Sequence, residues 1–148
     1  MKYLAHLCAL LLILSVVVAP AAATDGRYSY ITVTSVDVAL ENENATVTLT
    51  YTIDEGIQIL VHFLGMSDLR TKVIDIANFK NAEILEIDME HAVLLVPGAG
   101  LDYGEGAYWF PKHEFGVAVP VLTVTSPQDS RTFTNTTDFP RGMGYFRV

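Results

Sequence analysis

"ITVTSVDVALENENATVTLTYTI" occupies residues 31–53, and its pattern decides the class of fold. Apolar residues alternate with polar ones on both sides of the polar "ENEN" at residues 41–44. Such alternation, rich in β-branched residues, is typical of half-buried strands, and it predicts a hairpin closed by a four-residue loop. Val33 is out of phase with Val36. Because a slip of one residue moves a side chain to the other face, we expect a bulge near Ser35.

The period changes to that of a helix after the hairpin. Residues 55–64 carry apolar side chains at i, i+3, i+4 and i+7, with the acidic Asp54 before them and Gly65 after them. The same spacing returns over residues 68–78, for which Ser67 is the predicted N-cap. We expect two short helices. The first is apolar on nearly all sides and is therefore expected to be buried.

Strand patterns return after the helices and dominate the rest of the chain. Residues 82–90 alternate, residues 91–96 are typical of a buried strand that pairs with them, and residues 115–125 form a longer strand in which Pro120 indicates an edge or a bend. A weaker strand follows around residues 130–134.

The order of these elements predicts a mainly β fold. We expect an antiparallel β-sandwich, with an immunoglobulin-like arrangement as one form of it, and with the helical hairpin inserted between strands two and three. The alternative is an α+β domain whose helices cover one face of a single sheet.

The first 23 residues have the order of a secretory signal peptide. Lys2 precedes a long apolar run, and small residues end it at Ala23. We expect cleavage there, which leaves one extracytoplasmic β-rich domain over residues 24–148, secreted or held at the cell surface. The alternative is an uncleaved membrane anchor, because Tyr3–Ala23 is long enough to span a bilayer.

The composition excludes several kinds of partner and site. Loss of Lys2 with the signal leaves eight basic residues against 17 acidic ones, a formal charge of −9. Nucleic acid and anionic membranes require basic patches. We therefore expect no nucleic-acid partner, and a membrane partner only if the N-terminal segment is retained as an anchor. The single cysteine, Cys8, lies in that segment, so the mature domain has no disulfide or thiolate site.

A glycine-rich stretch at residues 98–106, "GAGLDYGEG", follows a predicted strand, as phosphate-binding loops do. Its Gly98, Gly100 and Gly104 have the spacing G-x-G-x-x-x-G, so the third glycine is one position late for a dinucleotide fingerprint. No helical pattern follows that could bind a pyrophosphate at its N-terminus. We expect no nucleotide and no other cofactor.

The glycines belong to a predicted loop over residues 97–116, and loops of this length in compact domains are often functional. Aromatic rings in such a loop can stack on sugars or anchor a protein partner. The alternative is that the rings fold back and fill one end of the core. The candidate ligand-binding residues are Tyr103, Tyr108, Trp109, Phe110 and Phe115.

Catalytic and metal-binding signals are weak. No H-E-x-x-H or G-x-S-x-G motif occurs, so we expect no catalytic residues and no enzyme. The weak candidates for a metal site are His91, His113 and Glu114, because zinc catalysis needs about three convergent ligands. Two N-x-[ST] sequons make Asn44 and Asn135 candidate glycosylation sites, and the position of Asn44 at the hairpin tip favours it.

Three functions follow, in decreasing order of support. The first is a non-catalytic extracellular or cell-envelope protein that acts through protein or surface contacts. The alternative is a protein that binds carbohydrate or another small ligand through the loop at residues 97–116. The second alternative is a metal-dependent hydrolase built on the two histidines.

Overall fold

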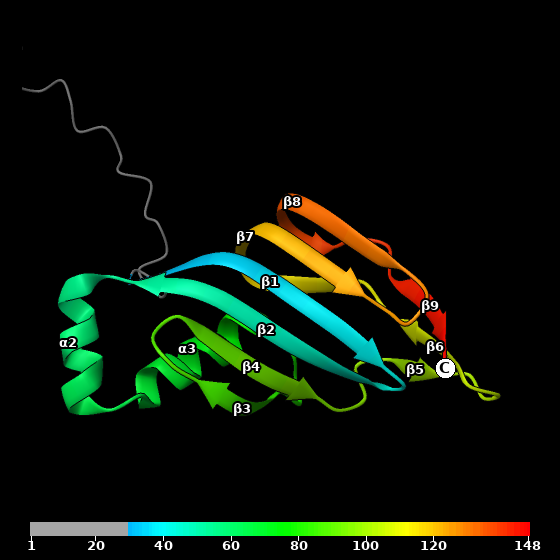
Figure 1. Cartoon of the computed structure of the whole chain (residues 1–148), viewed down its shortest axis with the longest axis horizontal. Helices are drawn as coiled ribbons and strands as arrows, with labels where there is room; N and C mark the ends of the chain where they lie inside the picture. The colour runs from blue at the N-terminus through cyan, green and yellow to red at the C-terminus, as the bar shows by residue number, and fades with distance from the viewer. Residues whose placement is uncertain (1–29) are drawn as a thin grey trace, which may run out of the picture.

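The computed structural model describes residues 30–148, so the predicted signal peptide at residues 1–23 lies outside the described residues. Nine strands and two helices follow one another along the described chain (Figure 1). In order they are β1 (Ile31–Glu41), β2 (Asn44–Ile53), α2 (Glu55–Leu64), α3 (Ser67–Ala77), β3 (Glu83–Ile87), β4 (His91–Val96), β5 (Leu101–Asp102), β6 (Ala107–Phe110), β7 (His113–Thr125), β8 (Ser130–Phe139) and β9 (Met143–Phe146).

The strands form two sheets, and the prediction of a mainly β fold is confirmed. The larger sheet has the order β3-β4-β2-β1-β7-β8, and the smaller has the order β5-β6-β9. The strand pairs are antiparallel, as expected, except for one: β1 and β7 run parallel, with Ser35 opposite Val121. The larger sheet is therefore mixed. The helical hairpin lies between β2 and β3, as expected.

The β1–β2 hairpin is the centre of the larger sheet. The predicted bulge is confirmed between Val33 and Ser35, and it returns the apolar residues on both sides of it to the core. The connection is tighter than the predicted four-residue loop, because Glu41 pairs directly with Asn44. A two-residue turn remains, in which Asn42 takes the left-handed conformation with φ of 52°.

Both helices form where the sequence predicts them, with two differences. Asp54 caps α2 by accepting a hydrogen bond from the Gly56 N–H at 3.0 Å. Ser67 is the first residue of α3 and not its N-cap, and Met66 in the cap position makes no side-chain hydrogen bond. The expectation that α2 is buried is wrong, because Val61 is its only buried residue.

Helix α3, in contrast, packs its apolar stripe fully against the larger sheet. Leu69, Val73 and Ile76 have no exposed surface. The helix approaches β7 closely at Gly116, where a Cβ atom would lie 2.6 Å from the Asp75 carbonyl oxygen. Glycine is therefore required at this contact for steric reasons.

Two strand details bear on the sequence patterns. A register shift between Ile84 and Glu86 interrupts the expected alternation of β3, and Leu85 is exposed there. Strand β7 runs between β1 and β8, but its pairing with β1 begins only at Val121. At Pro120 the strand is therefore paired on the β8 side alone, after a register shift between Glu114 and Val119.

The prediction of a loop over residues 97–116 is wrong for the centre of this stretch, where β5 and β6 form a hairpin. Strand β9, from the chain end that has no clear period, completes the smaller sheet by pairing with β6. The buried residues of both sheets and of α3 belong to one hydrophobic cluster. The smaller sheet and α2 lie at opposite ends of the long axis of the molecule (Figure 1).

Candidate functional site: an aromatic face on the smaller sheet

One face of the smaller sheet carries four exposed large apolar side chains. Leu101 of β5 lies opposite Trp109 of β6. In the next row of the sheet, the Tyr103 N–H donates to the Ala107 carbonyl oxygen, and Ala107 in turn lies opposite Phe146 of β9. Residues directly opposite each other in an antiparallel ladder project from the same face. Leu101, Tyr103, Trp109 and Phe146 are between 38% and 72% exposed, and we call this set the aromatic face.

Two glycines of the β9 segment support the indole of Trp109. A Cβ atom on Gly142 would lie 2.7 Å from Cζ2 and 3.0 Å from Cε2 of Trp109, and one on Gly144 would lie 3.4 Å from Cε3 and 3.7 Å from Cζ3. These atoms belong to opposite edges of the six-membered ring, so the ring lies across the two glycines. The indole is therefore packed over the backbone of this segment, and Trp109 remains 38% exposed. We call the two glycines the indole seat.

The position of Phe146 is also fixed. The side chain of Gln128 accepts a hydrogen bond from the Phe146 N–H at 2.9 Å and donates one to its carbonyl oxygen at 2.8 Å. Both backbone groups of the residue are thereby satisfied in the outer strand of the smaller sheet. The aromatic face is therefore held by backbone pairing and by this side-chain clamp.

The predicted aromatic residues divide between the two sides of the sheet. Tyr103 and Trp109 belong to the aromatic face, whereas Tyr108 is half-buried and stacks on Tyr145 with ring centroids 5.6 Å apart. Phe110 and Phe115 are core residues, 1% and 7% exposed. These two phenylalanines therefore have no free ring face to offer to a ligand.

Tyr145, which stacks on Tyr108, connects the smaller sheet to the β1–β2 hairpin of the larger sheet. The Tyr145 hydroxyl donates to the carbonyl oxygen of Asn42 in the β1–β2 turn. Burial raises the pKa of Tyr145, with Tyr108 adding to the rise, so its hydroxyl stays protonated and acts as a donor. This hydrogen bond holds the sheet that carries the aromatic face against the β1–β2 turn.

Sequence reasoning missed Leu101 and Phe146 as members of this face. Leu101 belongs to the glycine-rich stretch, and Phe146 to a chain end without recognisable period. In "GMGYF", residues 142–146, glycines alternate with Met143 and Tyr145. This alternation is a weak strand signal that could have indicated β9.

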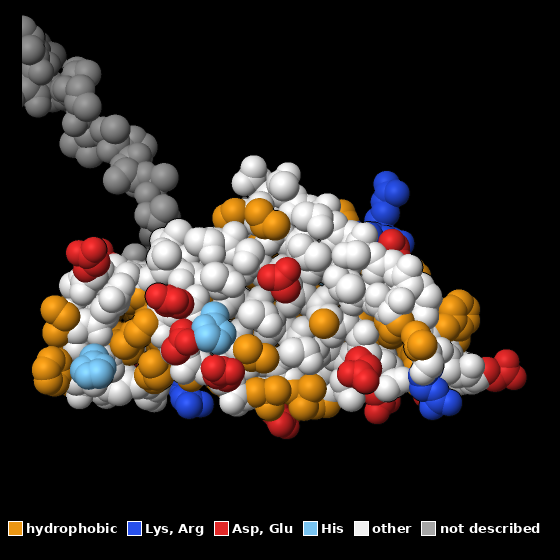
Figure 2. Space-filling model, in the orientation of Figure 1, with side chains coloured by type: hydrophobic (Ala, Val, Ile, Leu, Met, Phe, Trp, Pro, Cys, Tyr) orange, Lys and Arg blue, Asp and Glu red, His pale blue; other side chains and the backbone are white. Residues whose placement is uncertain are grey.

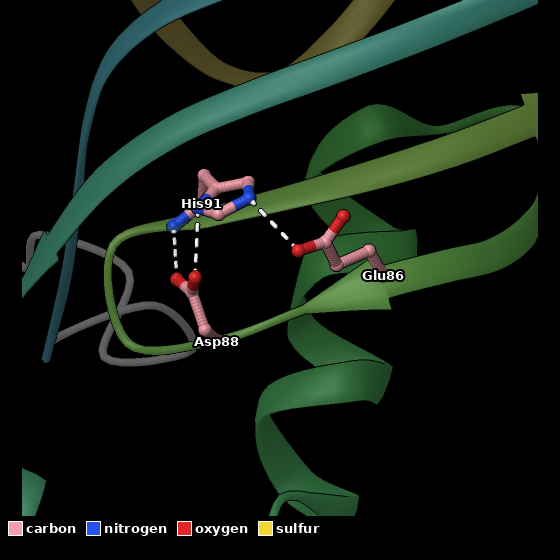
Figure 3. A group of neighbouring side chains, drawn as sticks. All are labelled: Glu86, Asp88 and His91. Carbon is pink, nitrogen blue, oxygen red and sulfur yellow. Dashed lines mark hydrogen bonds and ion pairs between the residues drawn. The ribbon is translucent and has the colours of Figure 1, made fainter.

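A second cluster lies at the turn between β3 and β4, where His91 sits between two carboxylates (Figure 3). The Asp88 Oδ2 atom is 2.8 Å from Nδ1 of His91, and the Glu86 Oε1 atom is 3.6 Å from Nε2. Within residues 30–148 these three side chains are the potential metal ligands that lie within 4.8 Å of one another. In this arrangement the two carboxylates approach different nitrogens of the His91 ring.

The geometry of this cluster is that of a hydrogen-bonded turn. Asp88 Oδ1 accepts from the N–H groups of Glu90 and His91 at 2.7 and 2.8 Å. Burial raises the pKa of Asp88, but these two N–H groups and the His91 ring lower it more, so the pKa lies below its ordinary value. Beneath the turn, the Tyr51 hydroxyl donates to the carbonyl oxygens of Asp88 at 2.7 Å and His91 at 3.1 Å. Burial, followed by the charge of Asp88, raises the pKa of Tyr51, which keeps this donor protonated.

The predicted metal ligands are not brought together. His91 is on β4 and His113 is on β7, with β2 and β1 between them. Three steps between neighbouring strands correspond to about 14 Å, far more than two ligands of one zinc ion can span. Glu114 is next to His113 in sequence, but it is exposed and its carboxylate lies 3.6 Å from the Lys112 ammonium. The hydrolase hypothesis therefore lacks its required geometry.

His113 has a packing role. Its ring stacks on Phe79 with centroids 3.6 Å apart and planes 1° from parallel. Nε2 lies 2.7 Å from the Ala77 carbonyl oxygen, and because a carbonyl only accepts, Nε2 carries the proton. Burial lowers the pKa of His113 despite opposing contributions from Ala77 and Glu114, so the ring is neutral near pH 7.

The two sequons lie in different surroundings. Asn44 begins β2, is half-buried, and its Oδ1 accepts from the Gly98 N–H at 3.3 Å. Asn135 is exposed on β8, at the edge of the larger sheet, with φ of 48°. Attachment of a bulky glycan is therefore sterically easier at Asn135 than at Asn44, the reverse of the order that the sequence favours.

Comparisons of the chain with protein-family models, with curated proteins and with solved structures found no significant match. The aromatic face is thus assigned from its own geometry.

Proposed function

We propose that the protein is a non-catalytic extracellular or cell-envelope module that acts through surface contacts made by the aromatic face. The observation that carries this proposal is the indole seat, which holds Trp109 across two glycines while 38% of the residue stays exposed. Exposed apolar patches on folded domains are commonly binding sites. Aromatic side chains supply much of the energy of such contacts because little conformational entropy is lost when a rigid ring is covered.

Export directed by the N-terminal segment at residues 1–23 is part of this proposal. The formal charge of −9 over residues 24–148 supports it, because a strong net charge keeps an exported domain in solution. We also propose that the two sheets form a sandwich. Their shared core supports this arrangement, as does the packing of Phe110 of β6 against Phe139 of β8 at 5.6 Å between ring centroids. An immunoglobulin-like form of that sandwich stays a prediction.

Carbohydrate is the ligand class that the aromatic face suits best. The apolar face of a sugar ring stacks on a flat aromatic surface, and the half-exposed Trp109 indole offers such a surface. Tyr103 and Phe146 add two further rings in the neighbouring row of the sheet. Four side chains also make a smaller surface than the roughly 800 Å² per partner of a typical protein–protein interface.

The test uses the intrinsic fluorescence of Trp109, which is the only tryptophan of the chain. Candidate oligosaccharides are first selected on a glycan array and then titrated while tryptophan emission is recorded. We expect a saturable change in emission for the unaltered protein. Affinities of the variants are measured by titration calorimetry, since Trp109→Ala has no tryptophan, and Trp109→Ala is expected to lose about tenfold or more in affinity. The control is Leu85→Ala, which removes an exposed apolar side chain from β3, outside the aromatic face.

Two results would contradict the proposal. Binding that is equally strong in Trp109→Ala and in Leu85→Ala would place the contact surface elsewhere. Turnover of a bound saccharide, abolished by the change of a single residue, would show that the module is catalytic.

A further inference from the structure

Helix α2 presents an unusual amount of apolar surface to solvent. Ile59, Leu60, Phe63 and Leu64 are between 50% and 81% exposed, and they gather at one end of the molecule (Figure 2). Beside the helix is an open hollow of about 300 Å³ lined by Gln58, Ile59, His62, Phe63 and Met89. Exposed apolar patches of this kind are normally covered by a partner or a membrane.

The chain enters the described domain at this same end. The carbonyl oxygen of Tyr30 accepts a hydrogen bond from the N–H of Asp54, the capping residue of α2, at 3.0 Å. The Tyr30 hydroxyl is bonded to the Asp68 carboxylate on α3, which fixes the entry point beside both helices. Seven residues, Thr24–Tyr30, separate this point from the apolar run that ends at Ala23. Seven residues span at most about 25 Å.

We propose that α2 lies in the surface of a phospholipid bilayer, in the leaflet on the exported side, next to an N-terminal segment retained as a membrane anchor. If Tyr3–Ala23 occupies the bilayer, the short connection holds α2 close to the headgroups. The four exposed apolar side chains of α2 then enter the boundary between headgroups and acyl chains, as interfacial helices do.

The charges of α2 specify the kind of lipid. Its only acidic residue is Glu55, in the first turn, and it contains neither lysine nor arginine. The helix therefore has no electrostatic attraction to anionic headgroups. A zwitterionic surface such as phosphatidylcholine fits it better. Neither helix of residues 30–148 is long and apolar enough to cross a membrane.

The short connection between the anchor and the domain determines how strongly α2 must bind the bilayer. Insertion of four side chains is a weak interaction by itself, because a surface helix without lysine or arginine relies mainly on apolar burial. An anchor on the same chain raises the effective concentration of the bilayer at α2, so a weak contact is populated. We therefore expect the separate domain to bind vesicles poorly and the anchored chain to keep α2 immersed.

This arrangement also orients the proposed binding surface. The aromatic face is carried by β5, β6 and β9, at the opposite end of the long axis from α2 (Figure 1). With α2 against the bilayer, the aromatic face is presented away from the membrane, where ligands outside the cell reach it.

The test uses the full chain, synthesised without cells in the presence of phosphatidylcholine vesicles. Phe63→Cys in a Cys8→Ser background is labelled with an environment-sensitive nitrobenzoxadiazole dye, and vesicles with and without doxyl-labelled lipid are compared. The matched control is Phe146→Cys, an exposed phenylalanine at the opposite end. We expect doxyl lipid to quench position 63, at a depth of about 5–10 Å below the surface, and to leave position 146 unchanged.

A second variant measures the contribution of the helix. In the full chain, Phe63→Glu is expected to draw α2 out of the bilayer surface, so that doxyl quenching of a dye at Leu64→Cys falls toward the level at position 146. This variant alters an exposed side chain, so the fold is expected to persist, as circular dichroism would check.

Three outcomes would overturn the proposal. The first is equal quenching at positions 63 and 146. The second is an exported protein that begins after Ala23 and does not fractionate with membranes. The third is a dimer in solution that Phe63→Glu dissociates, since α2 would then be covered by a second copy of the chain. None of these readouts depends on saccharide binding, so they are independent of the proposal for the aromatic face.

Discussion

Replacement of Gly142 by alanine is expected to lift the Trp109 indole from its seat. The new Cβ would lie 2.7 Å from Cζ2 of Trp109 and 2.6 Å from the Phe110 carbonyl oxygen. Carbon atoms in contact are about 3.5–4.0 Å apart, so a shift of about 1 Å is required. Phe110 is buried in a paired strand, so the clash with its carbonyl oxygen must be relieved by a shift of the backbone at residue 142, whereas the clash with the half-exposed indole displaces the ring. Overpacking of this kind costs about 1–3 kcal/mol.

Backbone strain adds to this cost and needs its own control. Gly142 has φ of 70°, a left-handed conformation that costs a non-glycine residue about 1–2 kcal/mol. Gly98 has φ of 65°, but a Cβ there would meet no atom within 4 Å. Gly98→Ala therefore carries the strain without the clash. The free energy of unfolding is expected to fall by about 1–3 kcal/mol more in Gly142→Ala than in Gly98→Ala.

The assay combines urea denaturation with tryptophan fluorescence. In Gly142→Ala the emission of Trp109 is expected to shift to longer wavelength and to be quenched more strongly by acrylamide, because more of the ring becomes wet. In Gly98→Ala both properties should match the unaltered protein. Equal losses of stability in the two variants, with unchanged emission, would refute the indole seat and weaken the aromatic face as a preorganised surface.

Three further changes test the support of the fold. Gly116→Ala places a Cβ 2.6 Å from the Asp75 carbonyl oxygen. This clash is expected to lower the free energy of unfolding, measured in urea, by about 1–3 kcal/mol. An unchanged free energy of unfolding would contradict the close contact of α3 with β7. Tyr51→Phe removes the donor to the Asp88 carbonyl and should cost about 1–2 kcal/mol, with faster amide exchange at the β3–β4 turn, and unchanged exchange would count against that anchor. Because burial lowers the pKa of His113 below its ordinary 6.5, the unfolded chain protonates first, so stability is lost as pH falls below 6.5. His113→Gln should flatten this part of the pH profile, and a profile identical to that of the unaltered protein would show that His113 does not cause it.

The local features of the fold could be predicted because they depend on neighbouring residues. The phase change between Val33 and Val36 indicates the bulge that the structure contains, since a strand must keep its apolar residues on one face. Helical spacing likewise located α2 and α3, and the β3–β4 pair followed from two adjacent patterns separated by a short turn.

The candidate site could be predicted only in part. Tyr103 and Trp109 belong to it, but the direction in which each ring points depends on β9, which is far away in sequence. Phe110 alternates with Trp109 along β6 and therefore faces the core. Without the partner strand, no pattern in the aromatic stretch could separate the two sides.

The metal hypothesis shows the same limit for charged residues. The turn between β3 and β4 brings the Asp88 carboxylate to 2.8 Å from Nδ1 of His91, a contact that no spacing pattern in the sequence indicates. His113 was grouped with His91 by residue type, but two strands lie between their positions.

The sequence by itself determined the class of fold, the central hairpin with its bulge, the two helices and the absence of a cysteine from residues 24–148. These properties follow from period, composition and local backbone preference. Only the tertiary structure decided the parallel pairing of β1 with β7, the exposure of α2 and the seating of Trp109 across two glycines. Each of these properties depends on which distant segment of the chain covers a given surface. Contacts between distant segments are fixed by the packing of the whole chain. They leave no periodic signal in either segment alone.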